Sequence, residues 1–150
     1  MDNDFVKDEE ILYRSLPYNK KDYYTIKEGE LKISSQAFGD RTMQPSVDRA
    51  DLCDRNPQKT QHDPRDGVLS LICKDIRMID DVVKRDEKGN EQLKYKIDVI
   101  PRPLENNIAH AQIEPSPEYQ TKSNFRKVQE RLAKLASDHI NKQGWEIKPK

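Results

Sequence analysis

The stretch Ser123-Asn-Phe-Arg-Lys-Val-Gln-Glu-Arg-Leu-Ala-Lys-Leu-Ala-Ser-Asp-His-Ile140 carries the clearest periodic pattern in this chain of 150 residues. Its apolar side chains recur every three or four positions, which is typical of a helix with one buried face. Ser123 is suited to the N-cap, and Gly144 is suited to closing the helix. We therefore predict one long amphipathic helix over residues 124–140.

Upstream of that helix, short apolar runs alternate with polar turns. Such runs predict strands, which fall at residues 11–14, 31–33, 47–48, 68–73, 92–99 and 108–113. The run 68–73 favours a central strand buried on both faces. Residues 82–99 favour a β-hairpin that turns at 87–90. A brief helix is expected in 48–54, followed by a long polar loop over 54–67.

Strands followed by a single long helix indicate an α+β fold. The expected architecture is a small, mostly antiparallel sheet with one long C-terminal helix packed on it and extended polar loops. The length suits a single domain over residues 1–150. Its acidic first residues, 1–9, are expected to be disordered.

The composition indicates a polar, folded protein. Charged residues make up 36% of the chain and hydrophobic residues 33%, and 27 basic side chains balance 27 acidic ones. A net charge of zero argues against a dedicated nucleic-acid or membrane binder. No apolar run approaches the length of a membrane span, and no signal peptide is recognisable. With Cys53 and Cys73 suited to a reducing compartment, a cytoplasmic location is expected.

The familiar motifs of phosphate loops, zinc sites and zinc proteases are absent, so neither a cofactor nor a metal is predicted. Binding is expected instead in the irregular stretch 31–48, with the loop 54–67 as a lid or contact surface. Within 31–48, Phe38 is interpreted as a core anchor and Asp40-Arg41 as a local turn. His62 is expected in solvent, and His139 at the boundary of the helix stripe.

Four residues are candidates for ligand binding or catalysis. Arg14 ends a strand, where a guanidinium could clamp a carboxylate or phosphate, or simply form an ion pair. Ser34 and Ser35 could orient a phosphate or supply a nucleophile, although such pairs commonly turn the chain. His110 lies between two alanines and could move a proton, or bond to a neighbouring loop. The catalytic candidates are therefore His110, Arg14 and Ser35, and no catalytic assignment follows from the sequence alone.

Two further patterns bear on function. The predicted helix carries a basic face, Lys122, Arg126, Lys127, Arg131 and Lys134, which could meet nucleic-acid phosphates. Glu130 and Asp138 dilute that charge. An arginine at a strand end, a serine pair and a later histidine or acid also loosely resemble the layout of ADP-ribosyltransferases. Glu114 and Glu118 are candidates for the acid by position.

Four short elements occur in order along residues 11–113. They are Leu12-Tyr-Arg14, Ser34-Ser-Gln-Ala-Phe38, Pro45-Ser-Val-Asp48 and Asn107-Ile-Ala-His-Ala111. The ordered set resembles a family of small bacterial proteins with Leu-Tyr-Arg, Ser-Ser-x-Ala-Phe, Ser-Val and Asn-x-Ala-His-Ala elements. The resemblance implies a bacterial cytoplasmic protein, in a defence or mobile-element setting, and implies no particular reaction.

Two hypotheses follow. The first is a non-catalytic binding or accessory protein of a bacterial protein complex, with another protein as its partner. The second is a small enzyme or sensor that binds a nucleotide or phosphate-bearing ligand through Arg14, Ser34 or Ser35, and His110. Convergence of Arg14, Ser35 and His110 on one pocket would favour the second.

Overall fold

The computed structural model describes residues 5–94, 96–116 and 121–150. In chain order the elements are β1 (Ile11–Leu16), η1 (Lys21–Tyr23), β2 (Tyr24–Lys27), β3 (Glu30–Ile33), η2 (Ser35–Phe38), β4 (Ser46–Arg49), η3 (Ala50–Cys53), η4 (Pro57–Thr60), β5 (Gly67–Ile72), α1 (Cys73–Arg77), β6 (Val83–Arg85), β7 (Glu91–Lys94), β8 (Ile97–Pro101), β9 (His110–Pro115) and α2 (Lys122–Gln143).

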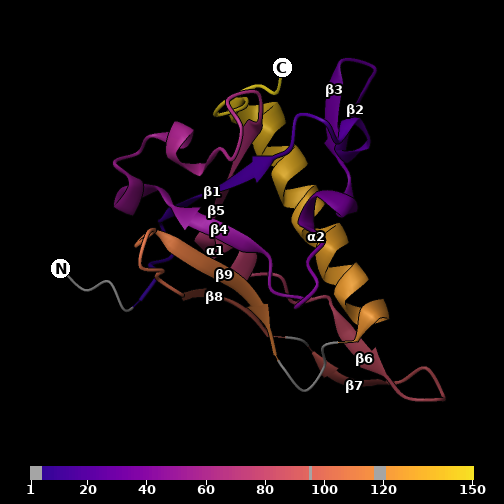
Figure 1. The fold of residues 1–150 in the computed structure, drawn as a ribbon. Coiled ribbons are helices and arrows are strands. Elements are labelled where there is room, and N and C mark those ends of the chain that lie inside the picture. The colour runs from indigo at the N-terminus through magenta and orange to yellow at the C-terminus, as the bar shows by residue number, and fades with distance from the viewer. Residues whose placement is uncertain (1–4, 95, 117–120) are drawn as a thin grey trace.

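The predicted α+β class is confirmed. Five antiparallel strands form one sheet in the order β5-β1-β4-β9-β8, and β2-β3 and β6-β7 form two separate hairpins. Helix α2 crosses one face of the sheet, with the two hairpins lying near its two ends (Figure 1). Its buried stripe is Phe125, Val128, Leu132, Ala133, Ala136 and Ile140. That stripe belongs to the same core cluster as inward-facing residues of the sheet.

The helix is longer than its sequence pattern predicted, and its N-cap is Thr121, not Ser123. Thr121 has extended backbone angles, and its hydroxyl accepts a hydrogen bond from the amide of Asn124 at 3.3 Å. Ser123 already lies inside the first turn, where a side chain cannot cap. Gly144 closes the helix as predicted, with a φ of 87° that favours glycine.

The run 68–73 is largely buried, as expected, but it was wrongly predicted to be a central strand. It forms β5 at the edge of the sheet, and Cys73 already begins α1. The amide of Val68 donates to the carbonyl of Ile147 at 2.8 Å, so the segment after α2 covers this edge. A covered edge strand is as apolar as a central one, which is why the pattern does not separate the two.

The alternating run 92–99 is not one strand. β7 pairs with β6 in the expected hairpin, whereas β8 pairs with β9 in the five-stranded sheet. A period of two persists when a chain passes from one sheet to another, because it reports side-chain direction and not the partner strand. Tyr95, which counted toward the pattern, lies outside the described residues.

Two other segments differ from expectation. Residues 24–27 form β2, which pairs with β3 through a turn at Glu28-Gly29 where both residues have positive φ. This strand was not predicted, because its residues are largely exposed and lie in a polar stretch of the sequence. At the N-terminal end, Val6 is fully buried in the core, so the disorder expected over 1–9 is wrong at this residue. Residues 1–4 lie outside the described part of the chain.

Next to that N-terminal segment lies a buried ion pair. Arg49 donates to both carboxylate oxygens of Glu10 at 2.8 and 2.9 Å, and also to the carbonyl of Phe5 at 3.0 Å. Both side chains are almost fully buried. The two parallel hydrogen bonds satisfy charges that would be costly to bury alone. The pair thus fixes the segment before β1 to the end of β4.

We expect Gly67→Ala to destabilise the protein. A β-carbon at this position would lie 2.8 Å from Pro149 Cδ and 3.2 Å from the carbonyl oxygen of Ile147. Overpacking of this kind costs about 1–3 kcal/mol. The free energy of unfolding from urea titration measures the loss.

Pro149→Ala removes the ring atoms that cause the closest contact and therefore provides the matched background. In that background, Gly67→Ala should cost clearly less than in the wild type, which is a coupling between the two sites. Equal losses in both backgrounds would show that residues 145–149 do not lie against β5.

Candidate functional site

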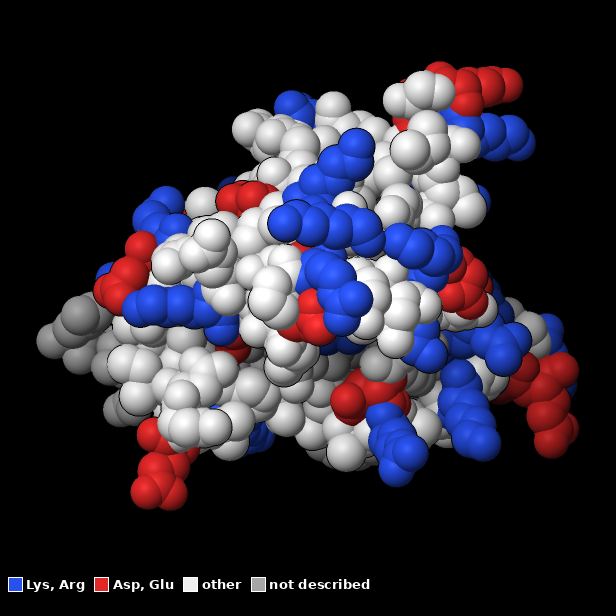
Figure 2. Space-filling view, turned by 45° about the horizontal axis from the view of Figure 1, so that its top comes forward, with Lys and Arg blue, Asp and Glu red and all other residues white. Residues whose placement is uncertain are grey.

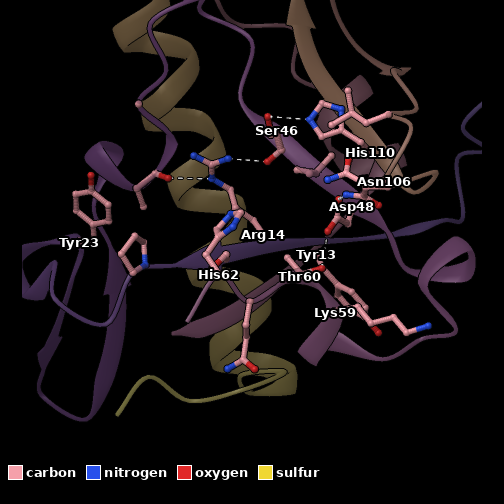
Figure 3. A pocket seen from close by; sticks show the side chains of 18 of the residues that line it. Tyr13, Arg14, Tyr23, Ser46, Asp48, Lys59, Thr60, His62, Asn106 and His110 are labelled. Atoms are coloured by element: carbon pink, nitrogen blue, oxygen red, sulfur yellow. Dashed lines mark hydrogen bonds between the residues drawn. The ribbon is translucent and has the colours of Figure 1, made fainter. Parts of the chain in front are cut away.

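A pocket of about 520 Å³ opens where β1 and β4 separate (Figure 3). β1 is paired with β5 along its whole length but with β4 only at Leu12 and Tyr13. Past Tyr13 the two strands part, and the side chain of Arg14 spans the gap. Its Nη1 donates to the carbonyl of Ser46 at 2.6 Å, and its Nε donates to the carbonyl of Ala37 at 2.9 Å.

Arg14 brings a positive charge to this pocket. Its guanidinium lies over the ring of Phe38, 5.1 Å from the centroid. Within the described part of the chain, no carboxylate forms an ion pair with it. The two carbonyls hold the group in place but leave N–H donors unused. The geometry leaves those donors available to an anion in the pocket.

Burial lowers the pKa of Arg14 to about 10, and the nearby charge of Asp40 partly opposes the shift. The side chain therefore stays protonated at neutral pH. Because the pKa is lower in the folded than in the unfolded chain, the charged form opposes folding. That penalty is present at every pH below about 10 and fades only as the pH rises toward the ordinary arginine value. A buried side chain that stays charged although its charge opposes folding is typical of a functional site.

Asp48 holds the two loops that wall the pocket. Its two carboxylate oxygens accept hydrogen bonds from Thr60 Oγ1 at 2.8 Å and from Asn107 Nδ2 at 2.9 Å. Thr60 ends η4 in the loop 54–67, and Asn107 belongs to the tight turn between β8 and β9. Asp48 is buried. Each of its carboxylate oxygens is occupied by a hydrogen bond to one of the two loops.

His110 lies at the first position of β9, facing the same side of the sheet as Asp48, its cross-strand partner. Its Nδ1 lies 2.8 Å from the carbonyl oxygen of Arg102, and its Nε2 lies 3.1 Å from Ser46 Oγ. Alternation along β9 places Ala111 and Ile113 in the core and leaves His110 half-buried on the opposite side. The imidazole is therefore held at both nitrogens.

The structure brings Arg14 and His110 together on one pocket and places Ser34 and Ser35 elsewhere. Those serines line a second groove, of about 990 Å³, between the β2-β3 hairpin and α2. Ser34 caps η2 through the amide of Gln36, and the carbonyl of Ser35 accepts a hydrogen bond from Gln129 Nε2. Two serines line the Arg14–His110 pocket, Ser15 and Ser46. Ser46, which entered the sequence analysis only as part of a motif, is the one that bonds to His110.

Other side chains singled out from the sequence take simpler places. Phe38 is fully buried, and Asp40 accepts hydrogen bonds from the amides of Thr42 and Gln44, which makes the expected local turn. His62 lines the pocket (Figure 3), so the loop 54–67 contributes to the site. His139 is half-buried on α2, as expected for a boundary position.

Both cysteines are free and buried. Burial raises the pKa of Cys73 to about 12 and also raises the pKa of Cys53, so neither forms a reactive thiolate at neutral pH. Among the residues that the structure describes, no group of three or more His, Cys, Asp or Glu could hold a metal ion. In the same part of the chain, no helix is long and apolar enough to cross a membrane.

The basic face of α2 is partly neutralised. Arg131 forms an ion pair with Asp81 at 2.7 Å, and Lys134 pairs with Asp138 at 3.1 Å. Figure 2 shows Lys and Arg side chains over the middle and right of one face of the molecule, with Asp and Glu side chains between them. Nucleic-acid binding through this helix stays a prediction.

Comparison with protein-family models, curated proteins and solved structures found no match to this chain. The resemblance to small bacterial proteins therefore stays a prediction.

The ADP-ribosyltransferase layout needs an acid, for which Glu114 and Glu118 were the candidates. Glu114 accepts hydrogen bonds from Arg102 at 2.8 and 2.9 Å. Glu118 lies outside the described residues.

We expect Asp48→Ala to release both pocket loops. Two hydrogen bonds to a charged group are lost, each worth about 1.5–3 kcal/mol. Hydrogen exchange should then rise at the amides of residues 57–61 and of residues 104–109, and the free energy of unfolding should fall.

Thr60→Val is the matched control, because it removes one of these bonds and keeps the shape of the side chain. Its effect should be smaller and confined to residues 57–61. Faster exchange in both loops of the Thr60→Val protein would show that Asp48 does not hold them independently.

Proposed function

We propose that this protein binds a small phosphate-bearing ligand, such as a nucleotide, in the pocket between β1 and β4. The observation that supports the proposal is Arg14, a half-buried cation without an ion-pair partner among the described residues. A ligand anion would offset the cost of desolvating this charge. The pocket volume of about 520 Å³ is in the range of small-molecule sites.

The sign of the charges around the pocket favours an anion. Asp48 is the carboxylate that lines it, and its oxygens already accept two hydrogen bonds. Lys59 at the rim pairs with Asp54. His62 and Asn106 add groups that can donate hydrogen bonds to phosphate oxygens. Arg14 is thus the charged group whose donors are left for a ligand.

A cytoplasmic location accords with this proposal, since nucleotides and other phosphate esters are abundant there. The two unpaired, buried cysteines agree with a reducing compartment.

Isothermal titration calorimetry with inorganic phosphate, pyrophosphate and AMP tests the proposal. At least one of these probes should bind the wild-type protein, and Arg14→Gln should weaken that binding about 10- to 100-fold, since a hydrogen bond to a charged group contributes about 1.5–3 kcal/mol. Thermal unfolding of the variant verifies its fold.

Arg126→Gln removes an equal charge from the exposed face of α2 and should leave the affinity unchanged. Absence of binding to all three probes would overturn the proposal, as would equal affinity in the Arg14→Gln protein. An equal loss in both variants would point to non-specific attraction by the overall charge.

A second candidate function is supported by a different observation. Leu104 and Ile108 are 48% and 61% exposed in the segment between β8 and β9, and Leu104 lines the pocket. Exposed apolar side chains next to a binding site are typical of protein interfaces. They favour the accessory protein of a bacterial complex, in a defence or mobile-element system, that the sequence analysis put first.

Co-purification of the tagged chain from its native host tests this second function. A partner should be recovered in a stable ratio, and the double substitution Leu104→Ser with Ile108→Ser should remove it. Ile26→Ser, at a 68% exposed position of the β2-β3 hairpin, is the control and should retain the partner. Recovery of the chain alone, or retention of the partner by the double variant, would count against it.

A further inference from the structure

The hydrogen bonds of His110 determine which of its ring nitrogens carries the proton. Nδ1 lies 2.8 Å from the carbonyl oxygen of Arg102. A carbonyl oxygen only accepts, so in the neutral ring Nδ1 is the donor and Nε2 is the acceptor. Ser46 Oγ, 3.1 Å from Nε2, therefore donates its hydrogen to the imidazole. Ser46 supplies a hydroxyl, His110 supplies a base that accepts its hydrogen, and the carbonyl of Arg102 orients that base. This is the arrangement of an activated serine.

These three groups are held by the sheet and not by a flexible loop. Ser46 begins β4, His110 begins β9, and Arg102 directly follows β8. The amide of Arg102 also donates to the carbonyl of His110 at 3.0 Å, which extends the β8-β9 pairing to these two residues. Ser46 and His110 both line the pocket and face each other in it (Figure 3). Positions fixed by neighbouring strands suit catalytic geometry.

We propose that Ser46 is a nucleophile activated by His110, and that the pocket hydrolyses phosphate esters. This inference rests on the proposed function, because Arg14 would hold the phosphoryl group. Arg14 Nη1 lies 2.6 Å from the carbonyl oxygen of the same residue that carries the hydroxyl. A phosphoryl group bound to this guanidinium would be held at Ser46, and its developing negative charge would face a cation.

The step balances without any further reactant than water. Ser46 Oγ forms a bond to phosphorus, its proton passes to His110 Nε2, and the bond from phosphorus to the ester oxygen breaks. The departing alkoxide takes the proton from His110 and leaves as an alcohol. Water, deprotonated by Nε2, then attacks the phosphoserine and releases inorganic phosphate or, from a diester, a phosphomonoester. Ser46 recovers its hydrogen from His110.

Covalent labelling tests the nucleophile directly. The full chain is incubated with diisopropyl fluorophosphate. An activated serine attacks the phosphorus of this reagent and displaces fluoride, and the resulting adduct is located by mass spectrometry. We expect one adduct, on Ser46, that is absent from Ser46→Ala and forms at least about 100-fold more slowly in His110→Gln.

Ser116→Ala is the matched control and should label as fast as the wild type. The hydroxyl of Ser116 donates to the carbonyl of Lys96 at 3.1 Å and has no imidazole partner among the described hydrogen bonds. An unlabelled Ser46, equal labelling of Ser116, or an unchanged rate in His110→Gln would each overturn the proposal.

A second measurement separates this inference from the proposed function. Hydrolysis of bis(4-nitrophenyl) phosphate should occur with the wild type and be lost in Ser46→Ala, whereas Ser46→Ala should still bind inorganic phosphate through Arg14. If phosphate binds but neither labelling nor hydrolysis occurs, the nucleophile is disproved and the binding site stands. If Ser46 is labelled but no phosphate probe binds, the proposed function fails and the activated serine stands.

Discussion

The separation of β1 from β4 after Tyr13 is the feature on which the rest of the site depends. A strand that leaves its neighbour exposes backbone carbonyls that the ladder would have used. Here a guanidinium takes the place of the missing strand pairing, because Arg14 donates to the carbonyl of Ser46 and to that of Ala37 in η2. α2 holds η2 from the other side through Gln129. One side chain thus joins the sheet, the η2 turn and, through that turn, the long helix.

The charges around the opening are divided between structural and available groups. Asp48 carries the negative charge, and both of its oxygens are committed to the loops. Arg14 carries the positive charge, and its bonds to neutral carbonyls leave that charge uncompensated. A hydrogen bond to a carbonyl fixes a guanidinium without neutralising it, whereas a carboxylate would do both. This choice of partners leaves the charge of Arg14 without an ion-pair partner among the described residues.

Local patterns predicted much of the fold. Helical periodicity located α2, and alternation along β9 gave the direction in which His110 points, since both depend on neighbouring residues alone. The edge position of β5 was missed because its covering residues, 146 and 147, are distant in sequence. The site was half predicted for the same reason. Arg14 and His110 stood out by residue type, whereas Ser46 joins them only through the strand order β1-β4-β9, which no local pattern records.

The way residues 145–149 lie against β5 has a consequence for solubility. Uncovered, β5 would present a row of free amides and carbonyls next to a run of valine, leucine and isoleucine, which is the composition of aggregation-prone strands. The cover is short and has few hydrogen bonds, so its local opening costs little. A single proteolytic cut after Gly144 would therefore leave a chain able to pair edge to edge with copies of itself.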